Sequence, residues 1–317
     1  MSTKNQKNRY ILLVVSSNYS KYSLLQGAKR GDIPHKFAYL SSGCRAWDAI
    51  SKDIEYNLGM RELNTLRKFL RFVKLNIGNE SYNIFHIGPG NGKEISDVVN
   101  TLTPELILNY VLLDISPELL NSAENVGRAK CPGIRFMTEI CDIIESEIGE
   151  IKERHSKANE KNLFLLVANG AILSNPSVLP NIKRSMGKDD RLIITLSTND
   201  DEQKIIDELK IDSVFNILVE PLKTLGINNV QLEQLDYEYS KEESVITVWF
   251  DFKKWIATNP DKNKKYENIP ERIKIFTTLR PKVEDFKKLL DSNGFKYEES
   301  DLISFQEERC VAVKCKT

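Results

Sequence analysis

Short runs of apolar residues alternate with helical patterns along the chain from residue 83 onward. A short apolar run bounded by turn residues predicts a β-strand, and apolar residues spaced three and four apart predict an amphipathic helix. The predicted strands cover residues 83–87, 110–114, 134–138, 163–168 and 191–196. The predicted helices between them cover residues 93–101, 117–129 and 180–186. Strands separated by helices of this length favour an α/β fold with a parallel sheet.

The pattern changes after residue 196. The elements predicted there are a charged helix (200–225), two strands (244–252 and 272–277) separated by a lysine-rich polar loop (259–268), and a helix (283–293) closed by Gly294. Two final runs, 296–303 and 310–316, favour an antiparallel pair at the sheet edge. We therefore expect an α/β sheet of seven strands whose last pair is antiparallel.

The segment between the fifth strand and the last helix is an insertion, which we expect to pack with the N-terminal residues. The expected organisation is a core of residues 61–198 and 281–317 and a second α+β lobe of residues 1–60 and 199–280. Within the N-terminal part, residues 10–15 predict a short strand.

A glycine-rich turn carries the first chemical signal. The strand over 83–87 breaks into Gly88-Pro89-Gly90-Asn91-Gly92, and the next strand ends in Asp114. Glycines permit a tight turn and let a ligand approach backbone N–H groups at a helix N-terminus. A carboxylate at the tip of the second strand can accept hydrogen bonds from both hydroxyls of a ribose. The G-x-G-x-G spacing, with His86 where many such sites have an acid, favours S-adenosylmethionine. A nicotinamide-dependent oxidoreductase is an alternative, as is a turn with no ligand.

The composition limits the classes of molecule that the protein is expected to bind. Forty-five basic and forty-five acidic residues cancel, so no overall field recruits nucleic acid or a membrane, and a small neutral or zwitterionic substrate fits better. No apolar run is long enough for a membrane-spanning helix, and residues 10–15 are too few for a signal peptide. Three scattered histidines predict no metal site. The cysteines, which form no C-x-x-C pair, predict buried free thiols in a reducing, cytoplasmic compartment: Cys44, Cys131, Cys141, Cys310 and Cys315.

The N-terminal segment Ile33-Pro34-His35-Lys36-Phe37-Ala38-Tyr39 resembles the start of the histidine-specific N-methyltransferases of ergothioneine biosynthesis. Residues that extend the resemblance are Gly43, Trp47, Ile50, Glu55, Tyr56, Glu62, the glycine turn, Asp114, Cys141-Asp142, Phe215-Asn216 and Arg280-Pro281. The resemblance implies a class I S-adenosylmethionine-dependent methyltransferase with a Rossmann-like sheet. It also implies that the second lobe binds the methyl acceptor.

The resemblance implies two sets of site residues. The cofactor set is Gly88, Pro89, Gly90, Asn91, Lys93, Asp114, Ile115, Asp142, Ile143 and Asn169. In this set Gly88 and Gly90 face the methionine end, Asp114 the ribose, and Asp142 with Ile143 the adenine. The acceptor set is Tyr39, Tyr56, Leu173, Ser174, Phe215, Lys274 and Phe276. The resemblance names no catalytic base, and the candidates are Tyr56 and an acid from the second lobe.

The residues that contact histidine in the family are not present at the matching positions of this chain. The family's asparagine after the fourth strand falls at Leu173 or Ser174, and its glutamate and serine before the last helix fall at Lys274 and Phe276. A tyrosine expected before Phe215 is also missing. A site that has lost polar groups for its ligand loses selectivity for that ligand.

We therefore expect methyl transfer to a small molecule other than histidine, at a nitrogen of an amine or amino-acid-like compound. Two alternatives keep the cofactor: O-methylation of a carboxylate or hydroxyl held by Lys274, and a degenerate member that binds the cofactor without catalysis. Lys274 can also be a plain solvated lysine on an edge strand. Whether the protein is a monomer or a homodimer stays open.

Overall fold

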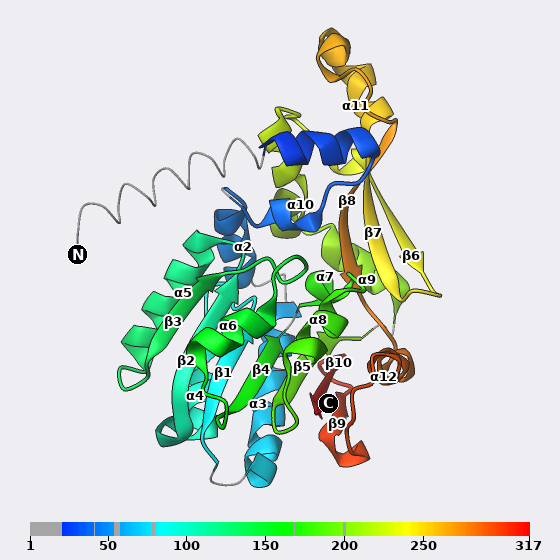
Figure 1. Cartoon of the computed structure of the whole chain (residues 1–317). Coiled ribbons are helices and arrows are strands. Elements are labelled where there is room, and N and C mark those ends of the chain that lie inside the picture. Colours follow the sequence, from blue (N-terminus) through cyan, green and yellow to red (C-terminus); the bar gives the residue numbers. More distant parts are fainter. Residues whose placement is uncertain (1–20, 41, 54–57, 78–79, 168, 199–200) are drawn as a thin grey trace, which may run out of the picture.

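The computed structural model describes residues 21–317 except 41, 54–57, 78–79, 168 and 199–200. Its main sheet has seven strands in the order β3-β2-β1-β4-β5-β10-β9 (Figure 1). The strands are β1 (Tyr82–Ile87), β2 (Ile107–Asp114), β3 (Phe136–Ile140), β4 (Lys161–Val167), β5 (Arg191–Ser197), β9 (Leu302–Phe305) and β10 (Cys310–Cys315). The first five are parallel, and β10 runs antiparallel to both β5 and β9. The predicted seven-stranded sheet with an antiparallel last pair is confirmed.

Helices cover both faces of this sheet. One face packs against α3 (Leu58–Ile77), α4 (Ile95–Leu102) and α5 (Pro117–Lys130). The other packs against α6 (Ile148–His155), α8 (Val178–Ser185) and α12 (Val283–Ser292). Since both faces are covered, the central strands are rich in apolar residues, and every residue of β1 is buried, including the polar Asn83 and His86. Short elements complete the connections: α7 (Gly170–Leu173), η2 (Pro104–Leu106) and η5 (Glu299–Asp301).

The predicted start of the helix after β2 is confirmed. The Ser116 side chain accepts a hydrogen bond from Leu119 N, and Pro117 occupies the first helical position of α5. This cap fixes the direction in which the chain leaves β2, so that Asp114 ends at the rim of the sheet.

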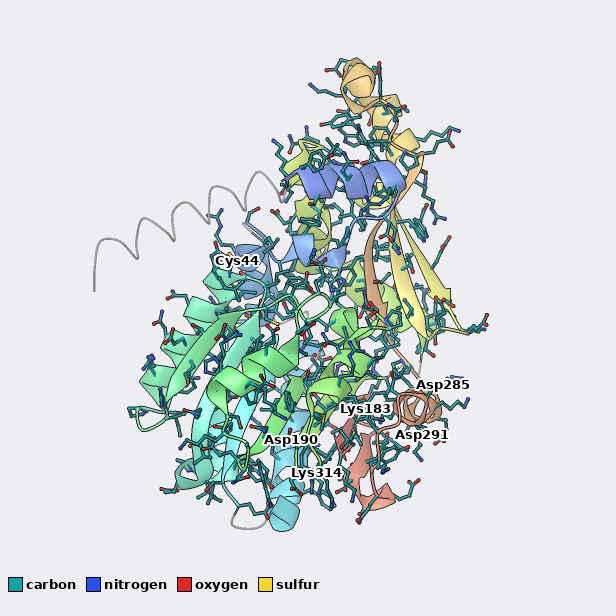
Figure 2. The ribbon with its side chains drawn as sticks, in the orientation of Figure 1. Cys44, Lys183, Asp190, Asp285, Asp291 and Lys314 are labelled. Atoms are coloured by element: carbon teal, nitrogen blue, oxygen red, sulfur yellow. The ribbon has the colours of Figure 1, made fainter. Side chains whose placement is uncertain are left out.

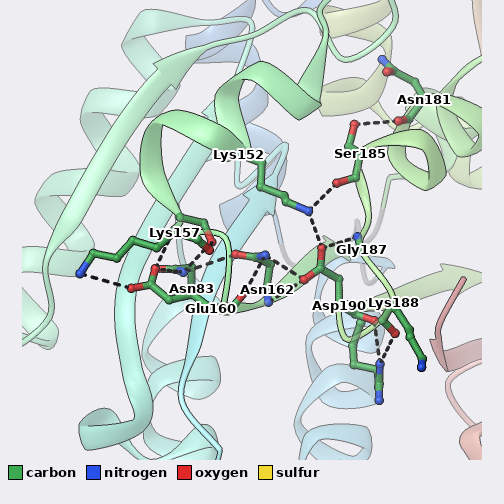
Figure 3. A network of polar contacts seen from close by, with 12 residues as sticks. Asn83, Lys152, Lys157, Glu160, Asn162, Asn181, Ser185, Gly187, Lys188 and Asp190 are labelled. Atoms are coloured by element: carbon green, nitrogen blue, oxygen red, sulfur yellow. Dashed lines mark hydrogen bonds and ion pairs between the residues drawn. The ribbon is translucent and has the colours of Figure 1, made fainter.

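A buried polar network holds the opposite end of the sheet (Figure 3). Asp190 accepts hydrogen bonds from Asn162 Nδ2 at 2.8 Å and Gly187 N at 2.7 Å, and pairs with Lys152 Nζ at 2.8 Å. Figure 2 shows Asp190 far from Cys44, which lies on the N-terminal segment. Lys314 on β10 pairs with Asp301 at 2.9 Å.

A second, antiparallel sheet is formed by β6 (Leu235–Ser240), β7 (Val245–Asp251) and β8 (Arg272–Leu279). Its elements share one core, which is separate from the cores on the main sheet. The helices are residues 21–30, η1 (His35–Ala38), α2 (Gly43–Lys52), α9 (Glu202–Leu209), α10 (Asp212–Leu225), η3 (Leu232–Gln234), α11 (Phe252–Thr258) and η4 (Pro260–Tyr266). The N-terminal segment joins this sheet because Ile33 N donates to Lys274 O at 2.8 Å.

Some predicted elements were wrong in detail. Residues 200–225 form two helices that break between Leu209 and Asp212, and the predicted loop over 259–268 contains the 3₁₀ helix η4. Strand β6 was missed, although its sequence Leu-Asp-Tyr-Glu-Tyr-Ser alternates apolar and polar residues as a half-buried strand does. The predicted strand 296–303 is confined to β9, apart from one bridge between Lys296 and Lys316. The predicted strand over 10–15 lies outside the described residues.

The cysteines largely follow their prediction. Cys131, Cys141, Cys310 and Cys315 are buried free thiols, whereas Cys44 is only partly buried. Within the described residues, no helix combines the length and apolar character needed to cross a membrane.

Candidate functional site

Two adjoining cavities open beside the carboxyl ends of the parallel strands. Cavity A has a volume of about 750 Å³ and is lined by the ends of β1 and β2, the loop after β3 and η1. Cavity B has a volume of about 1010 Å³, part of it open to solvent, and lies between the glycine turn and the second sheet. The residues that line both are Tyr39, Trp47, Gly88, Gly90, Asn169 and Ala171. The glycine turn is therefore a wall common to the two cavities, at the crevice where the strand order reverses.

The glycine turn needs its glycines. Gly88, Gly90 and Gly92 have φ angles of 62°, 54° and 74°, a region that favours glycine. A Cβ on Gly88 would lie 2.9 Å from Asn169 Oδ1, and one on Gly90 would lie 2.6 Å from Trp47 Nε1. A side chain at either position would fill the space that the two cavities share.

Asp114 lies in cavity A at the end of β2 and is 8% exposed. Its Oδ1 accepts a hydrogen bond from Ser116 N at 2.9 Å. Burial raises the pKa of Asp114 to about 6, against the opposing effect of backbone N–H groups from Ser116, Gly90 and Ile115. The carboxylate is thus ionised at neutral pH and keeps lone pairs for a ligand.

Lys36 connects the N-terminal segment to the loop after β3. Its Nζ lies 2.7 Å from Asp142 Oδ2 and 2.8 Å from Glu145 Oε1. Burial works to lower the pKa of Lys36, but its hydrogen bonds to both carboxylates raise it above the ordinary value. The neighbouring His35 also lines cavity A, and burial lowers its pKa to about 4, so it is neutral at neutral pH.

Aromatic rings line the junction of the cavities. The Tyr39 ring meets Trp47 edge-on at 5.8 Å and His35 edge-on at 6.4 Å, and His35 meets Phe276 at 6.5 Å. Burial raises the pKa of Tyr39, and the Asp114 charge adds to this effect. The Tyr39 phenol therefore keeps its proton and presents a neutral, partly apolar wall.

Cavity B contains two buried charges from different elements. Glu62 on α3 is 5% exposed and accepts a hydrogen bond from Ser197 Oγ at 2.6 Å. Burial raises the pKa of Glu62, and the charge of Arg280 opposes this shift. Arg280, just after β8, is 6% exposed and donates from Nη1 to Thr278 Oγ1 at 2.9 Å and to Leu279 O at 3.0 Å.

A buried polar chain lies under the glycine turn. His86 Nδ1 is 2.9 Å from the Tyr110 hydroxyl, and His86 Nε2 is 3.3 Å from Glu94 Oε1 without hydrogen-bond geometry. Burial raises the pKa of Glu94 to about 7 and lowers that of His86 to about 3. Glu94 lines cavity B, so an acid is present near the turn although β1 itself carries His86.

All members of the predicted cofactor set line one or both cavities. Those in cavity A are Gly88, Gly90, Asp114, Ile115, Asp142, Ile143 and Asn169, and those in cavity B are Gly88, Pro89, Gly90, Asn91, Lys93 and Asn169. Asn169 donates from Nδ2 to Ile87 O at 3.1 Å and to Val167 O at 2.7 Å. Its amide is thereby oriented beside Gly88.

Only some members of the predicted acceptor set line a cavity. Tyr39 and Phe276 line cavity B, and Tyr56 lies outside the described residues. Leu173 and Ser174 line neither cavity: Leu173 is buried in the core of the main sheet, and Ser174 bonds to Ala171 O and Thr277. Both belong to the short helix α7 and its end, of which Gly170, Ala171 and Ile172 line the cavities instead.

Phe215 and Lys274 are also away from the cavities. Phe215 packs at the margin of the second core, and Lys274 pairs with Asp32 at 2.8 Å. The register of β8 against β7 shifts between Lys274 and Phe276. Such a bulge reverses the usual alternation, so these two side chains lie on opposite faces of the sheet instead of one.

Sequence analysis gave no site role to several residues of the cavities, although Ile50, Glu62 and Arg280 were among those that extended the resemblance. In cavity B they include the charged Glu62, Glu94 and Arg280, the polar Thr278, and the apolar Ile50, Leu63, Leu209, Val214, Ile217 and Leu218. Phe276, Thr278 and Arg280 alternate along and just after β8, and this spacing was a signal available in the sequence. Among the described residues, no group of His, Cys, Asp or Glu side chains could hold a metal ion.

The fold, the glycine turn and Asp114 define a class I S-adenosylmethionine-dependent methyltransferase. The chain belongs to the family of histidine-specific, S-adenosylmethionine-dependent methyltransferases, whose model matches residues 21–301. The protein is therefore a methyltransferase that uses S-adenosylmethionine, as the resemblance implied. No curated protein sequence matches the chain.

Solved structures of other methyltransferases resemble the model at low sequence identity. A putative methyltransferase from Thermobifida fusca is 13% identical with a TM-score of 0.48, covering 90% of this chain and 95% of its own. Magnesium protoporphyrin IX methyltransferase from Synechocystis, solved with S-adenosylhomocysteine, is 11% identical with a TM-score of 0.46, covering 88% and 95%. A methyltransferase from Clostridium acetobutylicum is 13% identical with a TM-score of 0.41, covering 78% and 90%.

Proposed function

We propose that the protein transfers a methyl group from S-adenosylmethionine to a nitrogen of a small amine or amino-acid-like molecule other than histidine. The observation that carries this proposal is the pair of cavities joined at Tyr39 and the glycine turn. One has the carboxylates that suit a nucleoside, and the other combines buried charge with an apolar wall. Residues 1–60 and 199–280 form the acceptor lobe in this proposal, and residues 61–198 and 281–317 form the cofactor core.

Cavity A fits the nucleoside end of the cofactor. Asp114 has free lone pairs for the ribose hydroxyls, and Asp142 has lone pairs beyond those used by Lys36 and Ile144 N. The glycine turn leaves backbone room for the methionine end, where Lys93 can pair with a carboxylate. When bound, the cofactor supplies a methyl group already activated on its sulfonium.

The chain's own residues position the acceptor and exclude water. Tyr39 and Trp47 stand at the junction of the cavities, so a nitrogen held there would face the cofactor side. Glu62 is a buried acid that can hold an amino group and accept its proton, a role we had assigned to Tyr56.

Histidine suits this cavity poorly. An imidazole N–H requires an acceptor near the ring, yet the second lobe contributes Leu209, Val214, Ile217, Leu218 and Phe276 to the wall. Leaving polar ring atoms without partners in such a wall costs about 1–3 kcal/mol for each group. An acceptor with an apolar body avoids this cost.

The experiment is methyl transfer from isotopically labelled S-adenosylmethionine to a panel of amines, amino acids and carboxylates, with calorimetric titration of S-adenosylhomocysteine alongside. We expect base-stable label in an amine or amino acid. Base-labile label would instead indicate a methyl ester and the O-methyltransferase alternative. Binding of the cofactor product with no transfer to any compound would support a degenerate member and contradict the proposal.

We also propose a cytoplasmic location for the protein. The support is chemical: Cys131, Cys141, Cys310 and Cys315 are buried thiols without disulfides, which suits a reducing compartment. Fractionation of the native host with an antibody against the chain tests this, and recovery with the extracellular or periplasmic fraction would contradict it.

A further inference from the structure

Glu62 and Arg280 are two buried charged residues that form no ion pair with each other. Both line cavity B and are nine-tenths or more buried. In the described part of the chain, the Arg280 guanidinium forms no ion pair with any carboxylate, and its Nε is buried without a hydrogen-bond partner. Buried charges that are left apart are costly, and a ligand that carries both opposite charges would satisfy them together.

The packing around Arg280 indicates that its position is built into the fold. A Cβ on Gly170 would collide with Arg280 Nη1 and would lie 2.8 Å from both Leu279 O and Thr278 Oγ1. Thr278 and Leu279 O already hold Nη1. Nη1 is thus held by Thr278 and Leu279 O against Gly170, while Nε has no hydrogen-bond partner.

Charged residues other than Glu62 and Arg280 are available to bind the methionine end of the cofactor. Lys93 and Glu94 follow the glycine turn directly and both line cavity B. Arg280 instead follows β8 of the second sheet, the strand that also contributes Phe276 to the wall. Arg280 is therefore the cation assigned to the acceptor, and the charges of both Arg280 and Lys93 act on the pKa of Glu62.

The rest of the cavity wall is apolar. The side chains that complete it from α9 and α10 are Leu209, Val214, Ile217 and Leu218, and each is buried in the second core. A hydrocarbon group placed against them would gain roughly 25 cal/mol for each Å² of apolar surface removed from water.

We propose that cavity B binds a zwitterionic acceptor with an apolar body, namely an α-amino acid with an aliphatic or aromatic side chain. Arg280 binds its carboxylate, Glu62 binds its amino group, and the leucine-rich wall binds its side chain. This inference rests on the proposed function and specifies its acceptor class. The ammonium of the zwitterion first gives one proton to Glu62, which frees the nitrogen lone pair. That lone pair then forms the new N–C bond while the S–C bond breaks and leaves its electron pair on sulfur.

The test measures binding to the full chain saturated with S-adenosylhomocysteine, by calorimetry. The probes are L-leucine and L-phenylalanine, L-leucinamide without a carboxylate, 3-methylbutylamine, 4-methylpentanoate without an amine, and L-histidine. We expect leucine or phenylalanine to bind at least about tenfold more tightly than the amide, the amine, the acid and histidine, since each lacks one matched group.

Two variants assign this discrimination to Arg280. Arg280→Met should weaken leucine binding at least about tenfold while leucinamide binding stays unchanged, and Arg280→Lys should restore part of the preference. The affinity for S-adenosylhomocysteine should change in neither variant. If the Met variant does not fold, the comparison of leucine with leucinamide on the unmodified chain still tests whether the site recognises the carboxylate.

Three results would overturn the inference: equal binding of leucine and leucinamide, no binding of any apolar amino acid at millimolar concentration, or equal loss of cofactor-product binding in Arg280→Met. The last would assign Arg280 to the cofactor's own carboxylate. If 3-methylbutylamine accepts a methyl group as well as leucine does, the proposed function stands while this inference fails. Tight Arg280-dependent leucine binding without methyl transfer would support this inference and contradict the proposed function.

Discussion

Lys36 Nζ lies 2.7 Å from Asp142 Oδ2, so a residue of the N-terminal segment holds the acid that we propose binds adenine. Both side chains are mostly buried, with 22% and 16% of their surface exposed. The pair joins η1 of the acceptor lobe to the loop after β3 and thereby closes one side of cavity A.

Replacing Lys36 with methionine should weaken the binding of S-adenosylhomocysteine. The change leaves Asp142 without its cation and frees the N-terminal segment from the cofactor side, and a lost charge-assisted hydrogen bond corresponds to roughly tenfold in affinity. Lys36→Arg, which keeps the charge, should retain most of the affinity. Calorimetric titration checks this, and equal affinity of Lys36→Met and the unmodified chain would contradict the proposed role.

Asp114→Asn should stabilise the fold at pH 8 while it weakens cofactor binding. The folded-state pKa of about 6 lies above the ordinary value of 3.8, so the folded protein holds the extra proton and its stability falls as pH rises between these values. The difference corresponds to about 3 kcal/mol at most. The asparagine variant should therefore unfold at a higher temperature than the unmodified chain at pH 8 and match it at pH 4, yet bind S-adenosylhomocysteine at least about tenfold more weakly.

Thermal unfolding at both pH values and calorimetric titration measure these effects. An unchanged affinity would remove Asp114 from the cofactor site. A lower melting temperature at pH 8 would contradict the stated cause of the pKa shift.

Gly170→Ala should impair the acceptor side alone. The new Cβ would collide with Arg280 Nη1 and with the carbonyl of Leu279, so the guanidinium must move. We expect a raised KM for the acceptor with little change in the affinity for S-adenosylhomocysteine, together with about 1–3 kcal/mol of lost stability. Gly149→Ala is the matched control, because its Cβ would meet only Ser185 Oγ, at 3.9 Å. Equal KM values for the two variants would contradict this prediction.

Asp190→Ala should destabilise the core without touching the cavities. Asp190 is 3% exposed and receives bonds from Asn162, Gly187 and Lys152. Removing it leaves a partly buried lysine and buried amide groups without partners, at a cost of about 3–5 kcal/mol. Asp189→Ala, at an exposed neighbouring position, should change the free energy of unfolding by less than about 0.5 kcal/mol. Urea unfolding measures both, and similar values for the two variants would contradict the proposed importance of the network.

Much of the core could be predicted from sequence because its signals are local. The buried strands are short, mainly apolar runs, the α5 cap is a Ser-Pro pair, and the glycine turn with Asp114 has a fixed spacing. Each depends on neighbours in the chain and not on distant contacts, so pattern alone suffices.

The acceptor side could not be predicted in the same way. The β8 bulge between Lys274 and Phe276 moves Lys274 to the other face of the sheet, and a strand pattern contains no clear sign of such a shift. Glu62 and Arg280 line one cavity only because α3 and the end of β8 converge on it, although they are far apart in sequence. Contacts of this kind depend on the tertiary fold.

The most direct measurement of the central claim is a competition for methyl groups. The full chain would be incubated with deuteromethyl-labelled S-adenosylmethionine and an equimolar mixture of L-histidine, L-leucine, L-phenylalanine and 3-methylbutylamine, and the products would be analysed by mass spectrometry. The account predicts label on the nitrogen of an acceptor other than histidine, and none with the Asp114→Asn variant. Preferential labelling of histidine, or cofactor-product binding with no labelled product, would contradict it.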